Sequence, residues 1–354
     1  MKNSLISFIS TIQDEILSIN KFLYENPERP FEEYIAFNYI TKILRKYNFT
    51  VDNNFLDTPT AFCAHYGTTY PKIALLCKYS SSNSLQHIYG NNSNAAIAIG
   101  TAIALTNVVS KLNGEIVLLG CPGFEDASLE YRLSNNSILE DIDFLFVPQV
   151  YNDTILDYTS LASMSLRIIS KSINHTIDAW NSILNKLDVL CDTYSSNLSI
   201  STINNLCVEF QIKSINIALL SKIKDSLIKL LNKDYDIFIL DTPLHELTSN
   251  KTLCRLLAHN LKECGIIHIS NNVYVNQLIC SGNISETIPT IAPFISISED
   301  NSVKFPSANF SKITQTNFSN KSIINSILAL SITSLDIIQK ENLLMEIKKD
   351  FYNK

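Results

Sequence analysis

Glycine is scarce in this chain, with eight residues in 354. A phosphate-binding loop depends on several glycines within a short stretch, so the scarcity counts against such a loop. The eight cysteines form no C-x-x-C pair, and most, such as Cys77 and Cys207, lie in apolar runs. This usage is typical of reduced core thiols and predicts a cytoplasmic protein.

Dense positive charge and long apolar segments are also missing. The net charge is -6, and no basic patch is dense enough for a nucleic-acid interface. The first fifteen residues include Lys2, Asp14 and Glu15, so they lack the unbroken apolar region of a signal peptide. No uncharged run of 18 or more apolar residues follows. The sequence therefore predicts neither a nucleic-acid partner nor a membrane partner.

What is present is enough apolar material for one large or two ordinary domains, since 46% of the residues are hydrophobic and 18% are charged. In the first 158 residues, predicted strands alternate with predicted helices. The helices fall at 5–24, 31–47, 94–110 and 125–133, and the strands at 50–51, 60–66, 72–77, 115–120 and 143–147. This alternation predicts an α/β domain whose sheet carries helices on both faces.

The pattern changes at residue 159. Strands at 161–169, 198–203, 207–212 and 235–240 and helices at 177–190 and 217–231 follow the order β-α-β-β-α-β, which predicts a ferredoxin-like α+β domain. A helix at 253–264 leads back to the α/β region, which ends with a long helix at 309–339 and a shorter one. The predicted domains are therefore 1–158 with 266–354, and an inserted domain with its return helix at 159–265.

A short motif lies between the strand at 72–77 and the following helix, which is rich in small residues. Its sequence, His87-Ile88-Tyr89-Gly90-Asn91, resembles the H-x-C-G-H turn of the dinuclear zinc-dependent metallopeptidases and amidohydrolases. This superfamily includes aminoacylases, carboxypeptidases and aminobenzoyl-glutamate hydrolases. The resemblance implies that the cysteine and the second histidine of the turn hold metal, and here these positions are Tyr89 and Asn91.

The resemblance extends over nearly the whole chain. Pro27-Glu28 with Glu33 is similar to the opening motif of the family. Residues 250–265 are similar to the helix that follows the family's lid. Residues 281–296, which include Asn283, are similar to a later stretch of the aminobenzoyl-glutamate hydrolase branch. It implies a mixed-sheet catalytic-type domain, interrupted by a smaller ferredoxin-like lid that also dimerises.

The remaining site positions of the family are mostly replaced. After the strand at 115–120 the resemblance places the general base at Phe124 and a metal ligand at Glu125, and a shift of one residue would instead pair Glu125 with Asp126. The later histidine ligands have no counterpart at 146–149 or 305–310. The chain is therefore identified as a degenerate member, with Glu125 and Asp126 as vestigial catalytic candidates, no metal ligands and no expected cofactor.

Other catalytic arrangements find little support. The remaining histidines are single residues without partners at metal-ligand spacing. The serines at 80–84 lack a G-x-S-x-G context, and nothing places a base beside Cys121 or Cys280.

Two main hypotheses follow. The first is a pseudoenzyme that binds a small acyl-amino-acid or peptide-like ligand in a cleft between sheet domain and lid, or pairs through the lid as a homodimer or heterodimer. The cleft candidates are His87, Tyr89, Asn91, Asn92, Asn94, Glu125 and Asn283. The alternative is an amidohydrolase that cleaves an amide bond of an N-acyl amino acid or dipeptide. It would use zinc, manganese or cobalt held by atypical ligands such as His87, Glu125, Asp126 and Asp143. A third, purely structural role in an oligomer would leave a closed, apolar cleft.

Overall fold

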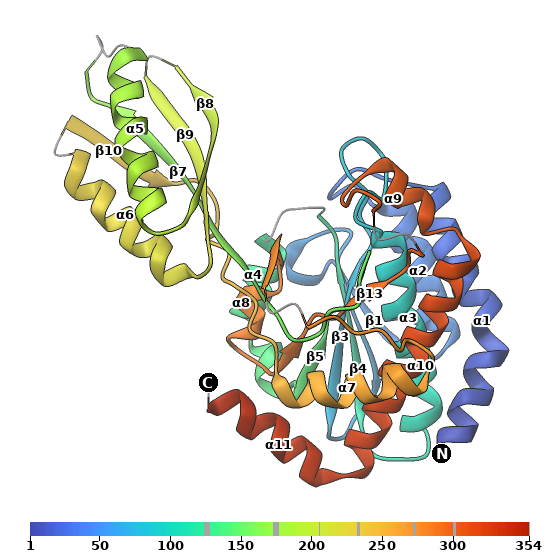
Figure 1. The fold of residues 1–354 in the computed structure, drawn as a ribbon. Coiled ribbons are helices and arrows are strands. Elements are labelled where there is room, and N and C mark those ends of the chain that lie inside the picture. Colours follow the sequence, from blue (N-terminus) through green and yellow to red (C-terminus); the bar gives the residue numbers. More distant parts are fainter. Residues whose placement is uncertain are drawn as a thin grey trace. The chain divides into compact units, whose positions relative to one another are not determined.

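The computed structural model describes residues 1–123, 128–172, 177–204, 206–231, 234–271, 274–299 and 302–353. They form two compact units, which Figure 1 shows as ribbons. Unit 1 comprises Met1–Asp157, Ser249–Asn272 and Ile284–Lys354, and unit 2 comprises Tyr158–Thr248 and Val273–Asn283.

The boundaries differ from the predicted ones at two segments. Helix α7 (Lys251–Glu263) belongs to unit 1, because its leucines at 253, 257 and 261 are buried in the core of that unit. Strand β11 (Tyr274–Leu278) belongs to unit 2, because it pairs in parallel with β7 (Thr159–Ser170). The return helix therefore forms part of the larger unit.

The main sheet of unit 1 has six strands in the order β1-β2-β4-β3-β5-β12. β1 (Thr50–Asn53) and β2 (Phe62–Gly67) run antiparallel to their neighbours. The parallel strands are β3 (Lys72–Lys78), β4 (Glu115–Cys121), β5 (Phe144–Phe146) and β12 (Thr290–Ile291). A second parallel pair joins β6 (Gln149–Tyr151) and β13 (Phe294–Ser296). The carboxyl ends of the parallel strands meet at one edge of the sheet, where α/β proteins place their sites.

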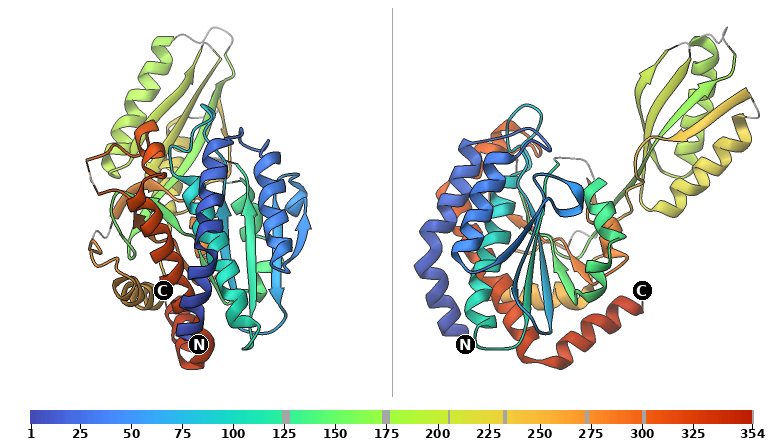
Figure 2. Two further views of the ribbon diagram at one scale, coloured as in Figure 1. Left: turned by 90° about the vertical axis from the view of Figure 1, so that its right-hand side faces the viewer. Right: turned by 180° about the vertical axis from the view of Figure 1, so that it is seen from behind.

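Helices cover both faces of this sheet (Figures 1 and 2). One face carries α1 (Lys2–Glu25), α2 (Tyr34–Lys46), α3 (Asn91–Val109) and α10 (Asn317–Gln339), and α7 and α11 (Glu341–Tyr352) join the same core. The other face carries α4 (Ser128–Ser134). The prediction of a mixed α/β sheet with helices on both faces is confirmed.

Helices α1, α3 and α10 pack closely around a glycine. A Cβ atom at Gly100 of α3 would lie 2.5 Å from Cδ1 of Ile327 and 3.1 Å from Cδ1 of Ile16, so no larger residue fits there. Among the described residues, α3 and α10 are long and apolar enough to cross a membrane by length and composition alone. In the structure, 94% and 67% of their most apolar windows are buried, as expected of core helices in a globular unit.

The predicted long helix at 309–339 is two helices, α9 (Ala308–Ile313) and α10. The break falls at Thr316, whose hydroxyl accepts a hydrogen bond from the backbone N–H of Ser319 at 3.2 Å. Threonine at this position is a preferred N-cap, so it starts a new helix. The apolar periodicity continues across the break, which is why the spacing alone predicted one helix.

Unit 2 has the order β7-α5-β8-β9-α6-β10, with α5 (Ile177–Thr193), β8 (Asn197–Ile203), β9 (Cys207–Ser214), α6 (Ile217–Leu231) and β10 (Tyr235–Ile239). Its antiparallel strands lie in the order β10-β7-β9-β8, which confirms the predicted ferredoxin-like pattern. Met164, Leu166 and Ile168 alternate along β7 and share one core with Trp180 of α5. Strand β8 forms an edge of the sheet and carries no charged residue.

Several short elements escaped the sequence prediction. They are η1 (Phe55–Asp57), η2 (Ser137–Asp141), α8 (Gly282–Ser285) and the strands β6, β11, β12 and β13. Each has too few residues to show a helical or strand period.

Candidate functional site

The turn that carries the motif joins β3 to α3 at the carboxyl edge of the main sheet. His87 in this turn is 2% exposed, and its Nε2–H donates to the carbonyl oxygen of Leu23 near the end of α1, at 2.9 Å. Burial lowers the pKa of His87 to about 4, with the backbone of Leu23 and Ser80 opposing the shift. The imidazole is therefore neutral at pH 7, and one of its nitrogens is committed to the end of α1.

Tyr89, at the position of the family's cysteine ligand, belongs to a cluster of aromatic rings. Its ring meets that of Phe305 edge-on, with the centroids 5.3 Å apart. Phe305 in turn meets Tyr151 at 4.8 Å and Phe310 at 4.7 Å, again edge-on, and Tyr151 meets Phe294 at 4.9 Å. Such arrangements of rings are mutually stabilising. The aromatic cluster of Tyr89, Tyr151, Phe294, Phe305 and Phe310 thus joins the turn position of Tyr89 to the segment 305–310, in which the resemblance implied a further metal ligand.

Asn91 and Asn94 occupy the first turn of α3 and use their amides internally. The Nδ2 atom of Asn91 donates to the carbonyl oxygen of Ser80 at 2.9 Å, and its Oδ1 accepts from Asn94 at 3.0 Å. Asn94 Oδ1 then accepts from the backbone N–H of Val150 at 2.7 Å. Both side chains are 5% exposed. This chain of hydrogen bonds links the segment after β3 and the middle of β6 to the start of α3.

Asn92 is fully buried and bonds to residues remote in the sequence. Its Nδ2 donates to Oδ1 of Asn20 in α1 at 2.7 Å and to the hydroxyl of Thr314 at 2.9 Å. Ser93 also donates to Asn20, at 3.0 Å. The Oδ1 atom of Asn92 has no hydrogen-bond partner among the described residues. Asn92 therefore ties α3 to α1 and to the segment that precedes α10.

A buried carboxylate that sequence reasoning left out of the site organises the same edge. Glu33 is 0% exposed, and its Oε1 accepts from the backbone N–H groups of Phe31 at 2.9 Å and Gly123 at 3.1 Å and from the hydroxyl of Ser80. Its Oε2 accepts from the hydroxyl of Thr60 at 3.0 Å. Glu33 thus fixes the carboxyl ends of β3 and β4. The signal that could have found it was the second glutamate of the opening motif.

Glu28, the first glutamate of that motif, caps α2. Its two carboxylate oxygens accept from the backbone N–H groups of Ile35 and Ala36, each at 2.8 Å. A carboxylate at a helix N-terminus satisfies otherwise unpaired donors and the helix dipole. The opening motif therefore has a structural role in this chain.

An ion pair also lies at the carboxyl edge. Nζ of Lys78, the last residue of β3, is 2.7 Å from Oε1 of Glu130 in α4, and the Glu130 side chain is completely buried. The ammonium neutralises this carboxylate, so Glu130 is not a free metal ligand. Burial raises the pKa of the neighbouring Cys121 thiol well above its usual range, with Glu130 adding to the shift and Lys78 opposing it. A thiol held protonated is a poor nucleophile.

The other predicted site residues are scattered. Phe124, Glu125 and Asp126 lie outside the described residues. Asn283 belongs to unit 2, where it binds the backbone of Pro243 and His245. Asp143 accepts from the backbone N–H of Lys72 at the amino end of β3. Because β3 spans seven residues at about 3.3 Å each, Asp143 is about 20 Å from the edge with the motif. Asp143 therefore cannot join His87, Glu125 and Asp126 as a ligand of one metal centre, as the amidohydrolase hypothesis required.

The described residues do not fit a dinuclear metal centre. Such a centre needs convergent thiolate, imidazole or carboxylate ligands. Within the described ranges, no group of three or more histidine, cysteine, aspartate or glutamate side chains is arranged to hold a metal ion. At the two turn positions the chain offers a phenol in an aromatic cluster and an amide engaged in hydrogen bonds.

No family model matches the chain. Among characterised proteins it is 24% identical to an Xaa-Arg dipeptidase from Mus musculus, in an alignment that covers 99% of this chain and 92% of the relative. It is also 27% identical to one of the subunits of the p-aminobenzoyl-glutamate hydrolase from Escherichia coli, over 34% of this chain and 29% of the relative. A crystal structure of a dinuclear metal-binding peptidase from Bacillus subtilis, of the M20 family, superposes with a TM-score of 0.66 at 14% identity and covers 92% of this chain and 99% of that one.

The chain is a relative of the M20 peptidases and amidohydrolases. The resemblance drawn from the turn, the opening motif and the later stretch is thereby confirmed. The M20 fold is shared with the Bacillus subtilis peptidase over nearly its whole length. In the turn, Gly90 takes a left-handed conformation (φ 68°) directly before α3, and the neighbouring side chains make the hydrogen bonds and ring contacts described above.

Proposed function

We propose that this chain is a pseudoenzyme of the M20 peptidase and amidohydrolase fold, which binds a ligand or a partner and does not hydrolyse an amide bond. The observation that carries the proposal is the aromatic cluster around Tyr89 and Phe305. Tyr89 stands at a position, and Phe305 in a segment, where the resemblance implies a metal ligand, and each ring packs against stabilising neighbours. The amide of Asn91 supports the same reading, because both its donor and its acceptor are in use.

The proposed ligand is a small acyl-amino-acid or peptide-like molecule. Support comes from the relatives, whose names describe a dipeptidase with Xaa-Arg substrates and a p-aminobenzoyl-glutamate hydrolase. A pocket of about 280 Å³ beside the turn, lined by Leu85, Gln86 and His87 together with ends of α1 and α9, offers polar and apolar contacts. Binding of such ligands in a metal-free site would rest on hydrogen bonds and burial alone.

We further propose that the chain pairs with a second copy or a related chain through unit 2. One relative is named as part of a hydrolase with more than one kind of chain, and β8 presents an uncharged edge on which Ile200 and Ile203 are 50% and 42% exposed. Edge strands of this kind accept a further strand readily. A cytoplasmic location is proposed because all eight cysteines are free thiols.

The second candidate is a metal-dependent amidohydrolase with atypical ligands. Its support is that both characterised relatives are named as hydrolases and that the Bacillus subtilis neighbour is a dinuclear metal-binding protein. Zinc, manganese or cobalt would need His87, Glu125 and Asp126 as ligands. The bound metal ion would lower the pKa of a water molecule, which could then attack the amide.

The deciding experiment is elemental analysis of the full chain after exposure to excess zinc and manganese and then desalting. The pseudoenzyme proposal expects less than about 0.1 metal ions per chain, since a site without convergent ligands loses its metal on desalting. One or two ions per chain would support the hydrolase instead. In that case Glu125→Gln and Asp126→Asn should lose the metal, whereas the exposed control Glu32→Gln should keep it. N-acyl amino acids and dipeptides are then screened in two assays. Product formation reports cleavage of the amide bond, and calorimetry reports binding without cleavage.

A further inference from the structure

A pocket of about 320 Å³ lies in unit 1 between the N-terminus of α1 and the helices α7, α10 and α11. Its volume is within the range of small-molecule sites. It is remote from the motif turn, since Thr314 touches Asn92 and Asp336 lies about 20 residues further along α10, or about 30 Å at 1.5 Å per residue. This pocket is therefore a separate site from the motif turn.

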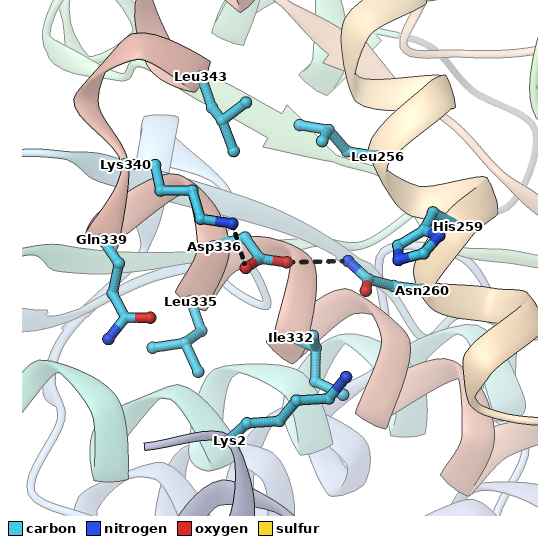
Figure 3. A pocket seen from close by; sticks show the side chains of 10 residues that line it. All are labelled: Lys2, Leu256, His259, Asn260, Ile332, Leu335, Asp336, Gln339, Lys340 and Leu343. Carbon is cyan, nitrogen blue, oxygen red and sulfur yellow. Dashed lines mark hydrogen bonds and ion pairs between the residues drawn. The ribbon is translucent and has the colours of Figure 1, made fainter.

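A carboxylate lies at the centre of the pocket, as Figure 3 shows. Asp336 Oδ2 is 3.4 Å from Nδ2 of Asn260, and its Oδ1 is 3.3 Å from Nζ of Lys340. Asn260 is 2% exposed and is held by the hydroxyl of Thr333 at 3.0 Å, so it fixes the carboxylate in place. Both bonds to Asp336 are long, and an ionised carboxylate has about four acceptor positions. Asp336 can therefore accept a further, shorter bond from a ligand ammonium.

Two lysines line the pocket together with this carboxylate. The Lys340 side chain is 57% exposed, and its ammonium is free to turn from Asp336 toward a ligand. Lys2, on the other side of the pocket, is 46% exposed and pairs with Glu263 at 2.8 Å. The lining thus contains two ammonium groups and one carboxylate. A ligand that carries one anionic and one cationic group on neighbouring atoms would match both signs.

The remaining wall is aliphatic. Figure 3 shows Leu256 and Leu343 on one side of Asp336, and Ile332 and Leu335 on the other. Ile332 and Leu335 are each 3% exposed, so they belong to the core and only a small part of each faces the pocket. An aliphatic side chain of the ligand would be buried against these four residues.

We propose that this pocket binds a free α-amino acid with an aliphatic side chain. The ligand ammonium donates to Asp336, its carboxylate accepts from Lys340, and its side chain lies against the aliphatic wall. The ion pair between Lys340 and Asp336 is thereby replaced by two charge-assisted contacts with the zwitterion. The site is non-catalytic, and it stands whether or not the turn binds metal.

The test is isothermal titration calorimetry on the full chain with L-leucine and two analogues. One analogue, 4-methylpentanoate, lacks the amine, and the other, 3-methylbutylamine, lacks the carboxylate. We expect saturable binding of leucine and at least tenfold weaker binding of each analogue. Asp336→Asn should weaken leucine binding at least tenfold, whereas Asp14→Asn, the same change at an exposed site of α1, should leave it unchanged.

A second variant keeps the test decisive if Asp336→Asn fails to fold. Lys340→Gln changes an exposed side chain and should weaken leucine but not 3-methylbutylamine. The proposal is overturned if leucine shows no saturable binding at millimolar concentration. It is equally overturned if 4-methylpentanoate binds as tightly as leucine, because the pocket would then be a simple anion site.

Discussion

Replacing Glu33 tests whether one buried carboxylate holds the carboxyl edge of the main sheet together. Glu33→Ala leaves the backbone N–H groups of Phe31 and Gly123 without their acceptor, at about 1–3 kcal/mol each, and removes one buried methylene group, at about 0.8 kcal/mol. The expected loss is therefore about 5 kcal/mol. Glu33→Gln keeps the size and one acceptor oxygen but loses the charge, for which we expect about 2 kcal/mol.

Urea unfolding of the full chain measures this effect. Trp180 is the only tryptophan and lies in the core of unit 2, so its fluorescence reports on that unit, while circular dichroism reports on both. We expect the transition of unit 1 to move to lower urea and the Trp180 signal to serve as an internal reference. Glu32 is exposed, and the same two substitutions there are the matched control. The reasoning fails if Glu33→Ala and Glu32→Ala differ by less than about 1 kcal/mol, which is the size of one ordinary hydrogen bond.

Three further changes probe other parts of the same edge. The folded pKa of His87, about 4, lies below its unfolded value of about 6.5, so the free energy of unfolding should fall as the pH drops from 6.5 to 4, by roughly 2–3 kcal/mol at pH 4.5. Chemical denaturation at several pH values measures this dependence, which should be weaker in the variant His87→Gln. Lys78→Met should lower stability by about 3–5 kcal/mol, because it leaves the buried Glu130 carboxylate unpaired. The double variant Lys78→Met/Glu130→Gln should recover at least half of that loss. Equal losses in the single and the double variant would disprove the pairing. At Gly90 a Cβ atom would lie 2.3 Å from a neighbouring side chain, so Gly90→Ala should lower stability by about 3 kcal/mol in thermal unfolding. Gly265 also has a positive φ but has room for a Cβ atom, so Gly265→Ala should lower stability by only about 1 kcal/mol. Similar losses at both sites would show that the neighbours of Gly90 move to relieve the overlap.

Much of the fold could be predicted from the sequence, because its long elements carry strong periodic patterns. Helix α1 buries Leu5, Ile9, Ile12, Ile16 and Ile19 at the spacing that predicted it. The ferredoxin-like order of unit 2 follows in the same way from alternating strands and amphipathic helices. The break before α10 could not be seen in the apolar pattern, because it depends on the cap at Thr316.

The motif drew attention to the residues of the turn, but it gave no sign of their partners. Asn92 bonds to Asn20 and Thr314, which are 72 and 222 residues away in the sequence. The available signal was weak: Asn20 is a polar residue on the apolar face of α1. The aromatic cluster depends on Phe305 folding back onto Tyr89, and no local spacing encodes such a contact. The side chains of the turn can be read from the sequence, whereas their contacts depend on how distant segments fold together.

The hydrogen-bond chain at the start of α3 also constrains how this protein can evolve. A histidine placed at position 91 would remove the amide that donates to Ser80 and accepts from Asn94. Those groups are buried, and each left unpaired would cost about 1–3 kcal/mol before any affinity for metal was gained. Positions 91 and 94 are therefore coupled, and the effect on stability of a change at one depends on the residue at the other. A histidine at position 91 would therefore lower the stability of the chain whatever it could bind.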